Sequence, residues 1–124
     1  RVIGRVTAAV LIARGMNPVH FSSPAALVKA MGISLKERIS GKYKGHLKIT
    51  KRGPGICRFY LYMAVLRLIQ DEPVIEDWYD RKVARDGGQI KNKAIIALMR
   101  DLVKALWYVA RGEEFDPVKM VSGA

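Results

Sequence analysis

Cysteine, histidine and carboxylate groups are scarce in this 124-residue chain, and each shortage excludes a class of function. Cys57 is the only cysteine, so no internal disulfide can form and a reducing, cytoplasmic compartment is favoured. No pair of Cys or His residues has the spacing of metal ligands, and His46 is more typical of plain surface than of a general base. No isolated acid stands in an apolar strand, as a two-metal nuclease requires. We therefore expect no metal or other cofactor within this chain.

Long uninterrupted apolar runs are also absent. The two longest, residues 59–69 and 94–110, are broken by charged side chains, whereas a membrane span needs roughly 20 apolar residues. No charged and apolar leader with a cleavage site precedes them. The chain opens at Arg1 without a methionine, and we expect it to be a segment of a longer protein or a processed product.

Positive charge is present in excess. The chain has 22 Lys and Arg against 11 Asp and Glu, giving a net charge of +11 and a pI near 10.1. An excess of this size on a small body favours a polyanionic partner, with nucleic acid first and a membrane surface as the lesser alternative. Hydrophobic residues make up 50% of the sequence, which is typical of a globular chain. Residues 1–124 are predicted to form one domain, with 113–124 as a tail.

Apolar periodicity, caps and breakers predict a small all-α domain. The first two helices, around a tight connection, resemble a helix-hairpin-helix, which binds DNA backbone without reading sequence. The third is apolar nearly all round and is predicted to be the central buried element. Trp78 and Tyr79 are interpreted as core anchors rather than base-stacking groups. The five predicted helices cover residues 8–14, 25–31, 56–70, 74–86 and 94–110.

A basic, glycine-containing segment at residues 39–53 separates the second and third helices. Apolar residues at alternate positions around it permit a short β-hairpin, although an irregular loop fits as well. Ser40 stands at its head beside Gly41, and the segment suits a surface that receives a phosphodiester. A solvated basic hairpin without a ligand is the alternative. Its cations are Lys42, Lys44, Lys48, Lys51 and Arg52.

Three further residues are candidates for phosphate contact. Gly4 and Thr7 belong to the glycine turn that leads into the first helix, where free backbone N–H groups and the positive dipole end can hold an anion. Gly4 could equally be only a turn residue. Arg58 lies one turn beyond the basic segment and could point toward its ligand, or form a salt bridge at the end of the core.

The order of short motifs along the chain resembles the C-terminal domain of the DEDD-type, bridge-RNA-guided insertion-sequence transposases, which are related to the Piv-type DNA invertases. The motifs that carry the resemblance are Gly-x-Val-Thr-Ala-Ala (4–9), Asn-Pro (17–18), Phe-Ser-Ser (21–23), Ser-Gly (40–41), Ile-Thr-Lys-Arg-Gly (49–53), Arg58, Leu-Tyr (61–62) and Phe-Asp-Pro (115–117).

This resemblance implies a function for the chain and for Ser40. Members of the family carry an RNase H-like domain with four acidic residues, where a divalent metal such as Mg²⁺ is expected, and the helical domain supplies a serine from a Ser-Gly motif. That serine, here Ser40, attacks a DNA phosphate. DNA, a guide RNA and a second copy of the full protein are the implied partners, and the isolated chain is expected to be inactive. The alternatives are a non-catalytic nucleic-acid-binding module and a structural fragment that docks a partner domain.

Overall fold

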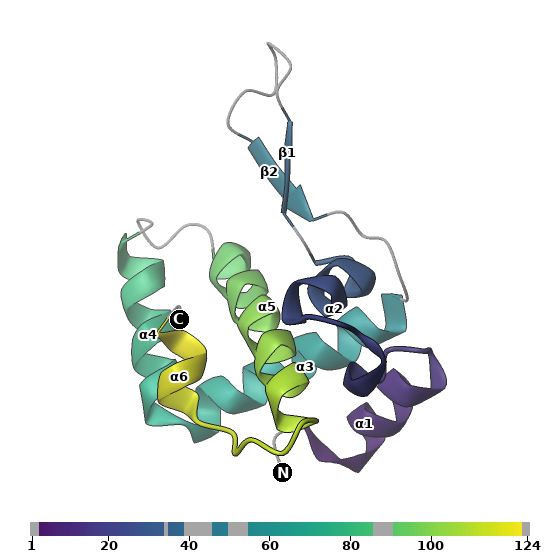
Figure 1. Cartoon of the computed structure of the whole chain (residues 1–124). Helices are drawn as coiled ribbons and strands as arrows, with labels where there is room; N and C mark the ends of the chain where they lie inside the picture. The colour runs from purple at the N-terminus through teal and green to yellow at the C-terminus, as the bar shows by residue number, and fades with distance from the viewer. Residues whose placement is uncertain (1–2, 34, 39–45, 50–54, 86–90, 123–124) are drawn as a thin grey trace.

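The computed structural model describes residues 3–33, 35–38, 46–49, 55–85 and 91–122. Helices dominate these residues, so the predicted all-α class is confirmed (Figure 1). None of the described helices is long and apolar enough to cross a membrane. The elements in chain order are α1 (Gly4–Ala13), the 3₁₀ turn η1 (Pro18–His20), α2 (Pro24–Met31), β1 (Leu35–Arg38), β2 (His46–Ile49), α3 (Gly55–Asp71), α4 (Pro73–Arg85), α5 (Lys91–Val109) and α6 (Pro117–Val121).

The ends of α2 follow directly from its sequence. The Ser23 side-chain oxygen accepts a hydrogen bond from the Ala26 backbone N–H at 3.1 Å, and Pro24 occupies the first helical position. Gly32 ends the helix with φ at 78°, a left-handed conformation that glycine adopts without steric cost. These signals explain why the predicted and observed bounds of α2 agree to one residue.

Helix α5 is the central element of the fold. The sequence predicts the helix at 56–70 in this position instead. In Figure 1 α5 lies between α4 and α6 on one side and α1 and α2 on the other, and it contacts α2, α3, α4 and α6. Its inner face is buried along its whole length. The buried residues are Ala94, Ile95, Leu98, Met99, Leu102, Val103 and Leu106.

Helix α3 is buried on only one side, so the prediction of a fully enclosed helix is wrong. Cys57, Leu61 and Val65 are fully buried in the core that α3 shares with α1, α4 and α5. The opposite side exposes large apolar side chains, among them Phe59 and Met63. The apolar pattern of α3 therefore continues beyond what this fold covers.

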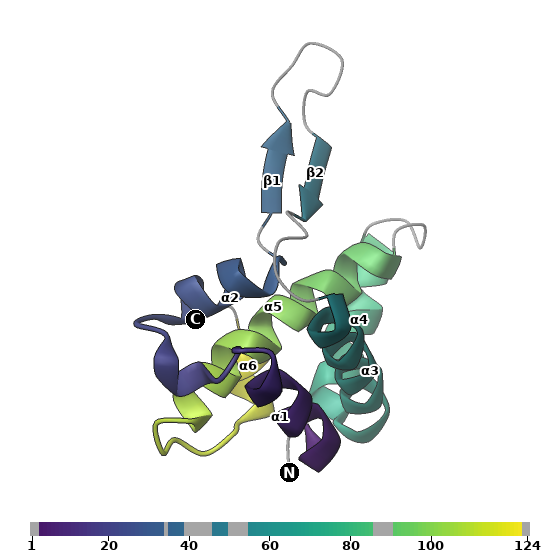
Figure 2. The same ribbon diagram turned by 90° about the vertical axis from the view of Figure 1, so that its right-hand side faces the viewer.

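The basic segment supplies the second strand of a two-stranded antiparallel ladder, which confirms the hairpin interpretation over the irregular loop for the residues that pair. Leu35 lies opposite Ile49 and Arg38 opposite His46. The ladder projects from the helical body near α2 (Figures 1 and 2). Residues 39–45, which join the two strands, lie outside the described residues.

The C-terminal segment is folded, so the predicted tail at 113–124 is wrong for residues 117–121. Asp116 caps α6 by accepting a hydrogen bond from the Val118 N–H at 2.9 Å, and Pro117 takes the first position. Met120 is buried in the core, and α6 packs on α4 and α5. Trp78 and Tyr79 pack against the same core, which confirms their interpretation as anchors.

Candidate nucleic-acid interface

The excess of positive charge is confined to the first part of the chain. Residues 1–58 contain twelve of the 22 basic residues and one acidic residue, Glu37, whereas residues 59–124 contain ten of each sign. The whole net charge of +11 therefore belongs to the part that forms α1, α2, the ladder and the first turn of α3. A field of one sign on one part of a small protein concentrates polyanions there.

The β1–β2 ladder carries basic positions on both strands. Lys36 and Arg38 belong to β1, and Lys48, a predicted phosphate ligand, belongs to β2 directly opposite Lys36 in the register. Because like charges opposite each other in a ladder repel, the pair Lys36 and Lys48 lowers the stability of the hairpin. An anionic ligand would relieve that repulsion.

The ends of α1 and α2 lie near the start of α3, where the charges of Arg14 and Arg58 both act on Cys57. The Arg58 guanidinium donates a hydrogen bond to the Met31 carbonyl at 3.3 Å, which ties the start of α3 to the end of α2. A Cβ built on Gly55 would lie 3.4 Å from the Arg58 Nη2, so the guanidinium extends back over the start of α3. Arg14 follows the last turn of α1, and exposed Lys29 lies in the last turn of α2. We call Arg14, Lys29 and Arg58 the helix-end cations.

The helix-end cations also have a structural role. The last carbonyl groups of α1 and α2 carry partial negative charge, and cations beside a helix C-terminus stabilise it by about 0.3–1 kcal/mol. Arg58 thus acts partly as a C-terminal partner of α2 through a hydrogen bond to a carbonyl group, while the salt bridge that the sequence left open stays a prediction.

Cys57 lies beneath this region and is chemically quiet. Its side chain is fully buried, and burial raises the pKa of the thiol, while the positive charges of Arg14 and Arg58 act in the opposite direction. A buried thiol with a raised pKa holds little thiolate and is a poor nucleophile. Cys57 is therefore a core residue.

Gly4 and Thr7 lie away from the ladder. The start of α1 is at the end of the body opposite to the ladder in both views (Figures 1 and 2). Gly4 has φ at 76° and lines an apolar cavity of about 370 Å³ with Ile12 and Leu106, while Thr7 is only 8% exposed. The structure does not bring these two residues together with the basic segment, and it does not present the Thr7 hydroxyl to a ligand.

The helix-hairpin-helix stays a prediction. Residues 14–23, with η1 among them, connect α1 to α2, and the two helices pack mainly on different partners: α1 on α3, and α2 on α5. The remaining predicted site residues lie outside the described residues. They are Ser40, Lys42, Lys44, Lys51 and Arg52.

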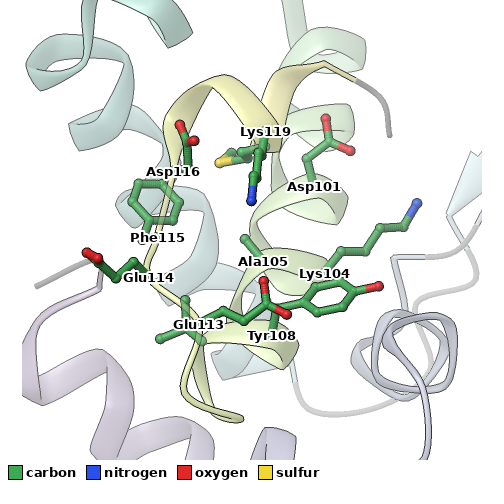
Figure 3. Close-up of a pocket in the computed structure, with 11 residues that line it drawn as sticks. Asp101, Lys104, Ala105, Tyr108, Glu113, Glu114, Phe115, Asp116 and Lys119 are labelled. Atoms are coloured by element: carbon green, nitrogen blue, oxygen red, sulfur yellow. The ribbon is translucent and has the colours of Figure 1, made fainter.

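A second cavity, of about 330 Å³, has a chemistry opposite to that of the basic region. It lies between α5, α6 and the segment that joins them, and Figure 3 shows Asp101, Glu113 and Asp116 around it together with Lys104. Burial raises the pKa of the Asp101 carboxyl, and the positive charges of Lys104 and then Arg100 oppose the shift. Carboxylates repel phosphate, so this cavity is not the nucleic-acid site.

Metal ligands are not gathered anywhere in the part of the chain that the structure describes: it contains no group of three or more His, Cys, Asp or Glu side chains that could hold an ion.

Comparison with known proteins identifies the family. A family model described as "Transposase IS116/IS110/IS902 family" matches residues 1–80. The chain belongs to this transposase family. Searches of curated proteins and of solved structures gave no match. Membership makes the chain an insertion-sequence transposase domain and implies DNA as a partner.

The part matched by the transposase model includes the whole basic part of the chain, residues 1–58. It covers α1, α2, both strands, all of α3 and the first half of α4, whereas α5 and α6 lie beyond it. The charge excess of this transposase domain is thus a property of the region that defines the family.

Arg111, two residues beyond the end of α5, has a structural role in this transposase domain. Arg111 stacks on the Trp107 ring, 3.7 Å from its centroid, and donates hydrogen bonds to the carbonyls of Pro18 and Phe21. Trp107 Nε1 donates to the same Phe21 carbonyl at 2.9 Å. These contacts attach η1 to the end of α5, a long-range arrangement that no local pattern could have revealed.

Proposed function

We propose that this chain binds the phosphodiester backbone of DNA with its ladder and helix-end cations, and that Ser40 is the nucleophile for strand cleavage and exchange. The observation that supports binding is the confinement of the net charge to residues 1–58 around a projecting antiparallel ladder. A narrow, cationic projection can enter a groove or lie along a strand, and phosphate contacts of this kind fix position without reading sequence.

Ser40 fits the nucleophile role by its position. It follows the last residue of β1, Arg38, by two residues and lies in the connection to β2, so the described ladder flanks it on both sides. In the proposed step the Ser40 Oγ bonds to phosphorus, and the bond from phosphorus to the leaving deoxyribose oxygen breaks. The hydroxyl proton passes to a base, the leaving oxygen takes up a proton, and a serine–DNA phosphodiester conserves the bond energy for rejoining.

Activation of Ser40 requires groups beyond this chain. A serine hydroxyl is a weak nucleophile at neutral pH and needs an adjacent base. We assign that base, and the divalent metal that the family resemblance implies, to the acidic RNase H-like domain. Cations beside Ser40 stabilise the additional negative charge at phosphorus. A guide RNA and a second copy of the full protein are the further partners in this proposal.

Backbone binding is tested with two variants of equal net charge. One replaces Lys42, Lys44, Lys48 and Lys51 by Gln; the control replaces Lys82, Lys93, Lys104 and Lys119 by Gln. We measure affinity for a short DNA duplex between 50 and 200 mM salt. The first variant loses about 100-fold in affinity or more, and its slope of log K against log salt falls by about 3.6, since each phosphate contact contributes about 0.9.

The control variant keeps its affinity within about threefold. Equal losses in the two variants would mean that net charge alone, and not the ladder region, holds DNA, and the proposed interface would then be wrong. Unchanged affinity in the first variant would have the same consequence.

The nucleophile is tested in the full transposase, with its acidic domain and guide RNA. A covalent protein–DNA adduct is trapped, and peptide mass locates the attachment. Ser40→Ala abolishes the adduct and recombination while DNA binding persists, and Ser34→Ala retains both. An adduct on another residue, or full activity of Ser40→Ala, would leave this chain as a non-catalytic binding module.

A further inference from the structure

The outer side of α3 exposes four large apolar side chains. Ile56, Phe59, Tyr62 and Met63 are 41%, 55%, 37% and 46% exposed. Their spacing places them on the side of the helix opposite Cys57 and Leu61. We call these four residues the outer face of α3. An apolar helix face that its own fold leaves open is typical of an interaction surface.

The charge around the outer face favours an anionic ligand. Between Gly55 and Gln70, α3 contains Arg58 and Arg67 and no carboxylate; Asp71, its last residue, is the first acid. Arg58 lies one turn before Tyr62 on the helix, and its guanidinium extends back over the start of α3 toward the end of α2. Helix α4, which packs on α3, carries acidic residues, so the excess of basic residues is a property of α3 itself.

The aromatic rings suit stacking. Phe59 is the most exposed residue of the outer face, and its ring meets the Tyr60 ring edge to face, with centroids 5.5 Å apart and planes at 86°. This contact restrains the Phe59 ring, so a ligand that stacks on it loses little additional side-chain freedom. Nucleobases stack on such rings whatever their sequence, because every base has a π-face.

The outer face is also close to the basic region along the chain. Helix α3 starts below the ladder and runs away from it (Figure 2). Phe59 lies four residues after Gly55, which is about 6 Å along the helix axis. A strand whose phosphates contact the ladder and helix-end cations can therefore place a neighbouring base over Phe59.

We propose that Phe59 and Tyr62 form a stacking platform for unpaired nucleotides, with Arg58 and the ladder cations binding the adjoining phosphates. This inference rests on the proposed backbone binding and specifies the ligand as single-stranded or locally unpaired nucleic acid. A protein partner is less favoured, because the exposed side chains combine aromatic rings with cations in the manner of single-strand-binding surfaces.

The test uses the whole 124-residue chain and a single-stranded oligonucleotide that contains 2-aminopurine, whose fluorescence falls when the base stacks. Phe59→Leu keeps the apolar volume but removes the ring, and Phe59→Trp keeps a ring. Tyr108→Leu is the matched control, since Tyr108 is 44% exposed but lies in the acidic cavity. Circular dichroism confirms that each variant is folded.

Phe59→Leu lowers the single-strand affinity about tenfold, in line with the loss of one stacked base, and abolishes the quenching. Its salt slope and duplex affinity stay unchanged, because no phosphate contact is lost. Phe59→Trp and Tyr108→Leu bind and quench as the parent chain does. Tyr62→Leu gives a smaller loss in the same direction.

Unchanged quenching in Phe59→Leu, together with the expected loss in the variant with four lysines of the basic segment replaced, overturns the stacking platform and leaves backbone binding intact. A change in self-association on sedimentation, without a change in oligonucleotide binding, also overturns it and assigns the outer face to a protein contact. No binding of either oligonucleotide or duplex by the parent chain overturns both proposals.

Discussion

Residues 1–58 and residues 59–124 differ in charge but share one core. The first region carries the entire net charge, and the second is balanced, with exposed acids on α4 and around the cavity beside α6. Yet Leu11, Leu27 and Met31 of the first region pack in the same cluster as the buried face of α5. Ligand-binding charge can thus be confined to one part of a chain while the stabilising core extends through both.

Substitutions in the shared core are predicted to have the largest effect on stability. Leu27→Ala in α2 and Leu102→Ala in α5 each remove a fully buried side chain, and each lowers the free energy of unfolding by about 2–5 kcal/mol. Val6→Ala, at a side chain 64% exposed, changes it by about 0.5 kcal/mol or less. Urea unfolding followed by circular dichroism and by Trp fluorescence measures these values.

Both leucine variants unfold in one transition that is the same for the two probes, because the regions are one cooperative unit. Two separated transitions, with Leu27→Ala shifting only one of them, would show that the basic region is a domain of its own.

The contact between Arg111 and η1 joins the two regions at the surface and gives a smaller effect. Arg111→Ala removes the stacking on Trp107 and the hydrogen bonds to the Pro18 and Phe21 carbonyls, and costs about 1 kcal/mol. Arg111→Lys restores only part of the lost stability, since an ammonium group cannot reproduce the planar geometry of the guanidinium donors. DNA affinity does not change. A loss of affinity with unchanged stability would place Arg111 in the interface instead.

Substitution of Asp101, which lies in the charge-balanced residues 59–124, is predicted to have the smallest effect on stability. Because burial raises the pKa of its carboxyl, the folded state favours the protonated form, and the charge on Asp101 costs stability as pH rises above the ordinary value near 3.8. Asp101→Asn therefore stabilises the chain at pH 7, by about 0.5 kcal/mol. The gain disappears below pH 3.8, where both states bind the proton.

Chemical denaturation of the parent and Asp101→Asn chains at several pH values measures this difference. A destabilised Asp101→Asn at neutral pH would mean that the attraction to Lys104 and Arg100 outweighs the burial of the carboxylate.

The sequence predicted those parts of the fold that local chemistry determines. Ser23, Pro24 and Gly32 define α2 through a cap, a first-turn proline and a left-handed end, and the alternation around residues 35–49 defines the ladder. The pair Asp116-Pro117 was the same kind of start signal, and it was overlooked because a five-residue helix has too few apolar positions to show a period.

The rest depended on tertiary packing. The apolar pattern of a helix sequence is the same whether one side or both sides of the helix are covered. The sequence therefore could not show that α3 is buried on one side only. The burial of Thr7 and the distance of Gly4 from the ladder likewise follow from how α1 packs on α3. The role of Ser40 rests on family resemblance and lies outside the described residues.

Amide chemical shifts, measured while the chain is titrated with a short DNA duplex, test the central claim most directly. The account predicts that shifts concentrate in β1, β2, the ends of α1 and α2 and the first turns of α3, and that α4, α6 and the acidic cavity remain unchanged. Shifts centred on α4 and α6, or spread evenly over both regions, would contradict it.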